Sequence, residues 1–210
     1  MEPKCYLYVV FSATPYKMGK FLRTVTRGQY NHVSVTSFSD LHELYSFARY
    51  YRNTPFWGGF VKESAARYCN GGRVASIRVC AIPIDRKCFD AVQRFLGHIQ
   101  STSEDYSYNL PSALCAPIRR RVYLKNSYTC VEFVSDLLIK CHACEELNAD
   151  EYYTISKLLR RLEAYIVYEG DFPHMYSGYA DAFDIRQPIW YATSKTLLQN
   201  WNLLFHMVRG

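Results

Sequence analysis

The alternation of apolar and polar positions along the first third of the chain predicts strands with a single helix between them. The stretch "CYLYVVFS", residues 5–12, is apolar on both faces of an extended chain, which is typical of a buried strand. The next stretch predicts a helix, with Thr14 as N-cap, Pro15 at the first helical position and Gly28 as the stop signal. The segments "YNHVSVTSF" and "HELYSFARY", joined by the turn-prone "SDL", predict a hairpin of two strands.

The remaining pattern adds helices and two more strands. The segment "NTPFWGGFVKE", residues 53–63, is interpreted as a loop because Pro, Gly and large aromatic residues dominate it. Further elements are expected as follows: a strand over 71–84, a helix over 86–100 capped by Asp85, a loop with a short helix over 101–126, helices over 130–144 and 155–164, a strand at "YIVYEG", and an amphipathic segment at "SKTLLQNWNLLFHMV". This order predicts an α+β fold.

Composition indicates one folded unit. The chain has 210 residues, of which 49% are hydrophobic, so it can bury a full core; we expect a domain over 1–170 and a C-terminal extension over 171–210 packed on it. The first residues show no signal peptide, and no window reaches the roughly 20 apolar residues of a membrane span, which favours a cytoplasmic location. The eight cysteines are then expected to be reduced thiols, and no cofactor is expected.

The charge of +6 is densest in "IRRRVYLK", residues 118–125. Such a run can attract an anionic surface, although a solvated connecting segment is the simpler interpretation, and no nucleic-acid partner is expected. A binding module that uses this run therefore stays as an alternative function.

Cys130, in "SYTCVEFVSDLLIKC", is the first candidate for chemistry because it lies at the start of a predicted helix. Free N–H groups and the helix dipole in the first turn favour a thiolate, and the N–H of Cys130 itself can contribute to an oxyanion site. A buried structural cysteine is the alternative. Cys141 and Cys144, in "CHAC", have the spacing of zinc ligands, but no second ligand pair accompanies them, so packing is favoured and no metal is expected.

His32 is the candidate base. It enters a predicted strand on the face opposite Val33 and Val35, from where it can be presented to a helix terminus. His42, on the partner strand, is the competing candidate.

Three segments in this order, "TPYKMGKFLRTVTRGQYNHVSV", "LHELYSFARYYRNTPFWGGFVKE" and "NSYTCVEFVSDLL", resemble the circularly permuted papain-like cysteine amidases, which are relatives of the NlpC-type peptidases. In the unpermuted relatives the cysteine helix precedes the histidine strand, whereas here the histidine strand comes first. The resemblance covers residues 5–170 and implies an antiparallel sheet packed against helices.

The resemblance implies that Cys130 is the nucleophile and His32 the general base. The third, orienting group is then either Ser46, which matches the local pattern of the second strand, or Glu43, which has the better spacing from the histidine; the two have opposite parity in a strand, and Ser46 is slightly favoured. Possible substrate-binding residues are Tyr30 and Tyr128, which flank the candidates, and Trp57, Gly58 and Gly59 near the expected mouth of the site; the tyrosines and aromatic residues can equally serve as packing.

The implied reaction is acyl transfer through a thioester, with an amide bond in a small peptide or an acyl amide as substrate. Water as the acceptor makes an amidase or peptidase. An acyltransferase, as in the related lecithin retinol acyltransferases, or a lipid (thio)esterase would use the same dyad. The oligomeric state stays open.

Overall fold

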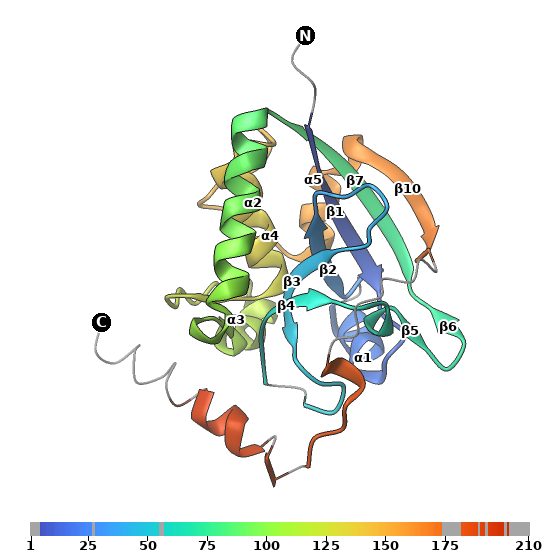
Figure 1. Ribbon diagram of the computed structural model, residues 1–210, viewed down its shortest axis with the longest axis vertical. Coiled ribbons are helices and arrows are strands. Elements are labelled where there is room, and N and C mark those ends of the chain that lie inside the picture. The colour runs from blue at the N-terminus through green and yellow to red at the C-terminus, as the bar shows by residue number, and fades with distance from the viewer. Residues whose placement is uncertain are drawn as a thin grey trace.

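The computed structural model describes residues 5–26, 28–54, 57–173, 182–188, 190–191, 193–199 and 201. They form an α+β fold built on one large sheet, as predicted (Figure 1). The helices and strands are β1 (Cys5–Ala13), α1 (Lys17–Thr26), β2 (His32–Thr36), β3 (Leu44–Arg49), β4 (Gly58–Glu63), β5 (Cys69–Asn70), β6 (Arg73–Val74), β7 (Ser76–Ile84), α2 (Arg86–Ser101), β8 (Ser107–Tyr108), α3 (Leu110–Cys115), β9 (Ser127–Tyr128), α4 (Cys130–Lys140), α5 (Ile155–Arg161) and β10 (Ile166–Asp171).

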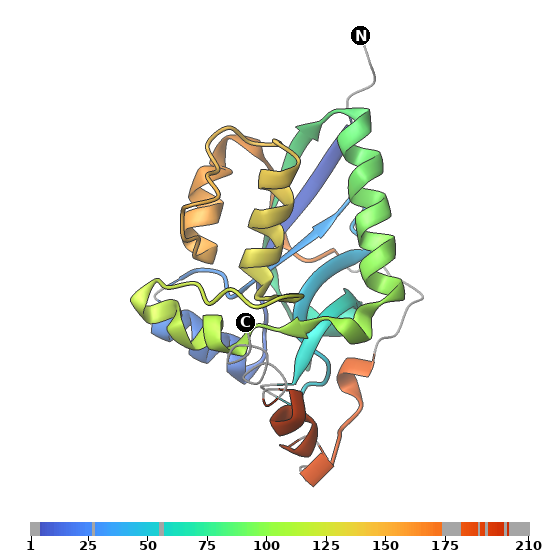
Figure 2. The same cartoon turned by 90° about the vertical axis from the view of Figure 1, so that its left-hand side faces the viewer.

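The main sheet has six strands in the order β10-β7-β1-β2-β3-β4, and every neighbouring pair is antiparallel. Helices α2 and α4 lie against one face of it (Figures 1 and 2). The larger core fills the space between this face and the helices, and includes Phe11, Val33, Phe47 and Phe133. This core anchors α4, the helix that begins with Cys130.

A second, smaller core covers the opposite face and includes Val10, Leu44, Tyr68 and Phe172. Val10 pairs with Ser34 in register, so Ser34 points to this same face. The central strands are therefore buried on both sides, although the sequence alternates between apolar and polar residues there. The polar side chains of β2 and β3 on this face consequently need hydrogen-bond partners inside the protein.

Several sequence-based predictions are confirmed. The first strand, the hairpin of β2 and β3 and the helix α2 all lie where the hydrophobic pattern predicts them. Asp85 caps α2, because its Oδ1 accepts a hydrogen bond from the backbone N–H of Cys88 at 2.6 Å.

Three predictions about elements are wrong. Helix α1 begins at Lys17, because Thr14 bonds to Asn31 instead of capping the helix. Residues 58–63 form strand β4 and not a loop, since Gly58 and Gly59 allow the chain to pair closely with β3. Helix α4 ends at Lys140, four residues before its predicted end.

Several described residues after position 171 contact the rest of the fold. The Phe183 ring lies 5.1 Å from that of Tyr16, and the guanidinium groups of Arg49 and Arg67 lie 5.3 and 4.6 Å from its centre. The side chain of Gln199 donates to the carbonyl of Gly58 at 2.7 Å. The amphipathic segment at 194–208 falls partly outside the described residues. Within the described part of the chain, none of the helices has the length and apolar character needed to cross a membrane.

Candidate active site

Cys130 is the first residue of α4, and the residues around it explain why the helix starts there. Thr129 is the N-cap and forms a capping box with Glu132: its hydroxyl accepts from the N–H of Glu132, and its own N–H donates to Glu132 Oε2 at 2.8 Å. Within the described ranges, the N–H groups of Cys130 and Val131 have no hydrogen-bond partner. Cys130 is 7% exposed, so the thiol sits at the edge of the core beside two free donors.

His32 opens strand β2 and is fixed by the residue before it. Asn31 exchanges two side-chain hydrogen bonds with Thr14, of 3.0 and 2.8 Å, and its backbone N–H donates to the carbonyl of Ser12 at 3.0 Å. These bonds hold the turn between α1 and β2 against β1. The side chain of His32 is 13% exposed, and Cys130 lies close enough to it to help raise the pKa of the imidazole. Two candidates that lie 98 positions apart in the chain therefore meet in the fold.

Glu63, the last residue of β4, holds the other side of the His32 ring. Its Oε1 lies 2.5 Å from His32 Nε2 and accepts from the Ser46 hydroxyl at 2.5 Å. Its Oε2 accepts from the hydroxyl of Tyr68, which in turn lies 3.1 Å from that of Ser34. Glu63 is 3% exposed, and both of its carboxylate oxygens have donors. A buried carboxylate with this many donors is satisfied in its ionised form.

The pair of His32 and Glu63 carries opposite charges at neutral pH. Burial by itself lowers the pKa of His32, but the charge of Glu63 and the hydrogen bonds to Cys130 and Glu63 outweigh it and raise this pKa to about 10. For Glu63, burial has the opposite effect and by itself raises the pKa. The charge of His32, the charge of Arg67 and the Ser46 hydroxyl outweigh it and bring the pKa of Glu63 down to about 2. Because Nε2 is held by the carboxylate, Nδ1 is the ring nitrogen left for the thiol.

The two candidates for the third group have different surroundings. Ser46 lies on the same face as His32, as its parity predicts, and it reaches Glu63. Glu43 instead accepts from the amine of Lys62 at 2.5 Å and from the hydroxyl of Tyr45 at 2.9 Å. The group that contacts the histidine ring is thus Glu63, which sequence reasoning missed.

A signal for Glu63 was present in the sequence. If "GGFVKE" forms a strand, residues two positions apart lie on the same face, so Val61 and Glu63 share one. The histidine competitor, His42, pairs with Asp40 at 2.5 Å in an exposed loop and has no place in the site.

The two tyrosines that flank the candidates both pack against other side chains. Tyr30 is 2% exposed, with its ring 6.4 Å from that of Phe11 and the Arg78 guanidinium 5.8 Å from its centre. The ring of Tyr128 lies 5.1 Å from that of Phe47, inside the aromatic part of the larger core.

The proposed residues of the mouth also have structural contacts. Trp57 packs edge-on against Tyr191 of the C-terminal extension, with ring centres 5.6 Å apart. A Cβ on Gly59 would lie 2.8 Å from the Tyr106 carbonyl, and one on Gly58 would meet the Ala48 carbonyl. The two glycines therefore allow close backbone approach around β4.

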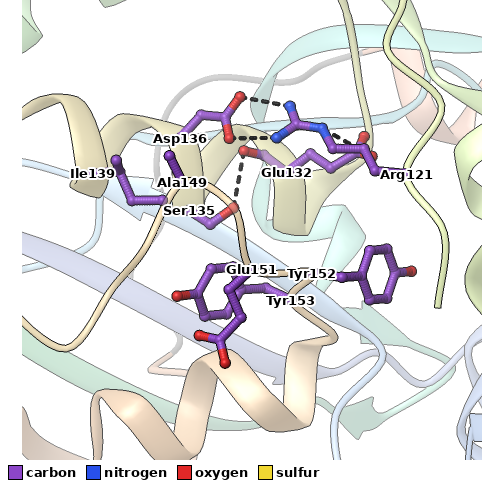
Figure 3. A pocket seen from close by; sticks show the side chains of 9 residues that line it. All are labelled: Arg121, Glu132, Ser135, Asp136, Ile139, Ala149, Glu151, Tyr152 and Tyr153. Atoms are coloured by element: carbon purple, nitrogen blue, oxygen red, sulfur yellow. Dashed lines mark hydrogen bonds and ion pairs between the residues drawn. The ribbon is translucent and has the colours of Figure 1, made fainter.

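A narrow polar hollow of about 10 Å³ lies along the outer side of α4 (Figure 3). Arg121 forms a two-pronged ion pair with Asp136 across it, at 2.8 and 2.6 Å, and its Nε lies 3.5 Å from Glu132. One cation of the basic run is thus occupied in fastening residues 116–126 to α4, whereas Arg119 and Arg120 are exposed. A larger hollow of about 260 Å³ lies beside β4, lined in part by Phe60.

All eight cysteines are free thiols. Cys144 is 5% exposed, and its thiol donates to Glu146. Among the residues that the structure describes, no group of three or more His, Cys, Asp or Glu side chains is placed to hold a metal ion. Cys144 belongs to the larger core and Cys141 packs against it, which agrees with the packing interpretation of "CHAC".

Comparison with known proteins adds nothing to this geometry: no protein-family model, no curated protein and no solved structure matches the chain.

Proposed function

We propose that the protein is a thiol-dependent amidase or peptidase that cleaves an amide bond through a thioester on Cys130. The observation that carries this proposal is the position of His32, which has the thiol on one side and Glu63 on the other. A nucleophile, a base within hydrogen-bond reach and a third group that orients the base are what covalent catalysis needs.

The charges of the site support the same chemistry. A protonated imidazole beside a thiol favours the thiolate, the reactive form of cysteine. Glu63 stabilises that imidazolium from the other side, since it stays ionised in its buried site. The thiolate attacks the carbonyl carbon, and the free N–H groups of Cys130 and Val131 are placed to receive the charge that forms on the carbonyl oxygen.

His32 gives or takes the proton in each step of the reaction. The imidazolium gives its proton to the leaving amine, which departs and leaves an acyl thioester on Cys130. Neutral His32 then takes a proton from water, the hydroxide attacks the thioester, and the thiolate–imidazolium pair is restored as the acid is released. An alcohol or amine in place of water would make the same site an acyltransferase.

We also propose that the fold is a permuted papain-like fold. Its support is the chain order, in which the histidine strand β2 precedes the cysteine helix α4, and the antiparallel sheet that α4 packs against.

The test is the pH dependence of iodoacetamide labelling at each cysteine, followed by mass spectrometry. We expect Cys130 to label fastest of the eight cysteines at neutral pH, and to lose this advantage in His32→Ala and Glu63→Gln. The matched control is His42→Ala, which removes a histidine paired with a carboxylate outside the site.

A folded His32→Ala variant whose Cys130 labels like the wild type would overturn the proposal and favour a binding module. Where labelling depends on His32, acyl amides and small peptides are screened for a covalent acyl adduct on Cys130. Release of the adduct by water identifies a hydrolase, and release only by added amines or alcohols identifies an acyltransferase.

A further inference from the structure

Tyr68 lies directly behind the candidate site and is fully buried. It follows a short 3-10 turn (Ala65–Arg67) after β4, and its ring stacks on that of Phe172 with centres 4.2 Å apart and planes 9° apart. This stacking fixes the ring, and the ring carries its hydroxyl to the rear of the Glu63 carboxylate.

The two oxygens of Glu63 have separate donors. Oε1 accepts from His32 and Ser46, and Oε2 accepts from Tyr68. The last torsion of a glutamate side chain is broad and nearly two-fold, so one donor pair alone does not fix the plane of the carboxylate. A donor on Oε2 stops this rotation and keeps Oε1 aimed at His32.

The Tyr68 hydroxyl is itself oriented. Its single proton goes to Glu63, so the Ser34 hydroxyl, 3.1 Å away, is the donor to the Tyr68 oxygen. Burial, followed by the charge of Glu63, raises the pKa of Tyr68 well above its usual value, and the residue therefore keeps its proton.

We propose that Tyr68 is a positioning residue of the Cys130 site, which acts by fixing the carboxylate of Glu63 and, through it, the ring of His32. This inference rests on the proposed function, and it adds to the site a residue beyond the nucleophile and the base. Ser34 belongs to the same arrangement as the group that orients the Tyr68 hydroxyl.

The other charged groups around this arrangement are few. His32 faces Glu63 and Cys130, and Glu63 faces His32 and Arg67. Arg67 also acts on Tyr68, so its charge favours the ionised form of Glu63 from the same side. The charges of His32 and Arg67 are still present when the Tyr68 hydroxyl is removed. A change in the pKa of Glu63 in that variant is therefore attributed to the lost hydrogen bond.

The chain offers a matched control. Tyr45 also donates to a carboxylate, that of Glu43, at 2.9 Å, but on the opposite face of β3. Tyr68→Phe and Tyr45→Phe thus remove the same kind of hydrogen bond, in one case inside the proposed site and in the other case outside it.

The experiment follows the glutamate carboxyl carbons by 13C NMR as a function of pH, with Glu63 assigned from Glu63→Gln. In Tyr68→Phe we expect the midpoint of Glu63 to rise by about one pH unit or more, because a hydrogen bond to the ionised form is lost. Labelling of Cys130 by iodoacetamide at neutral pH should fall severalfold. Tyr45→Phe should leave both quantities unchanged.

A folded Tyr68→Phe variant with the wild-type Glu63 midpoint and wild-type labelling overturns the inference. If Tyr68→Phe does not fold, Ser34→Ala takes its place. A smaller rise in the Glu63 midpoint with a smaller fall in Cys130 labelling supports the inference, and no change in either quantity overturns it. The proposed function fails separately, through labelling of Cys130 that does not depend on His32.

Discussion

His32 Nε2 and Glu63 Oε1 lie 2.5 Å apart although β3 separates their strands in the sheet. Two strand spacings amount to roughly 9.6 Å, and the contact closes because a glutamate side chain reaches across the middle strand. Ser46, on β3, lies between them and donates to the same Oε1. A small hydroxyl side chain thus both leaves room for the contact and contributes to it.

Substitution of Ser46 should separate the two effects. Ser46→Val fills the space with a branched apolar side chain, so we expect it to push Glu63 away from His32 and to reduce Cys130 labelling at neutral pH to that of His32→Ala. Ser46→Ala keeps the space and removes only one donor, so labelling should fall by less. Equal labelling in both variants and in the wild type would contradict this account.

The stability of the protein should depend on pH through the same pair. Glu63 has its pKa lowered from 4.5 to about 2, so its contribution is present above pH 4.5 and is lost as the pH falls toward 2. His32 has its pKa raised from 6.5 to about 10, so its contribution is present below pH 6.5 and is lost as the pH rises toward 10. The decrease in the free energy of unfolding caused by Glu63→Gln should therefore be largest between pH 4.5 and 6.5.

Urea unfolding of the wild type and Glu63→Gln at acidic, intermediate and alkaline pH measures this difference. Glu169→Gln serves as the control, because Glu169 pairs with Arg78 at the surface of the protein. A loss of stability in Glu63→Gln that is the same at every pH would show that the pair does not titrate as described.

Substitution by alanine should change the stability of the protein in opposite directions at two glycines. Gly59→Ala should destabilise the protein by about 1–3 kcal/mol, because the new Cβ would press on the Tyr106 carbonyl and the Tyr50 side chain next to β4. Gly97→Ala, in helix α2 and with open space around it, should stabilise it by up to about 1 kcal/mol. Thermal unfolding of the two variants decides, and the same sign in both would contradict the packing described around β4.

Arg121 should matter for stability, unlike its neighbours in the basic run. Arg121→Gln breaks the two-pronged pair with Asp136 and should lower the free energy of unfolding by about 2 kcal/mol, whereas Arg120→Gln should change it by no more than about 0.5 kcal/mol. Chemical unfolding measures both. Retention on an anionic matrix tests the binding module separately, since Arg119 and Arg120 can be neutralised without disturbing this clamp.

Periodicity and capping signals alone predicted most of the elements. The run of apolar residues in β1, the cap at Asp85 before α2 and the alternation in β2 are local features, and local hydrogen bonds and the burial of one face are enough to decide them. Cys130 was predicted at a helix start for the same reason, because a polar, aromatic segment gives way there to an apolar-periodic one.

The partners of those elements were decided only by the tertiary structure. Thr14 has the features of a helix cap, but Asn31, distant in sequence, binds it instead. Glu63 stood in a segment whose glycines and aromatics favoured a loop, and only pairing with β3 made that segment a strand. The sequence by itself determined the fold class and the two residues that we propose as nucleophile and base. It did not determine the carboxylate that holds His32, because that contact depends on the register of three strands and on the small size of Ser46, which no local pattern encodes.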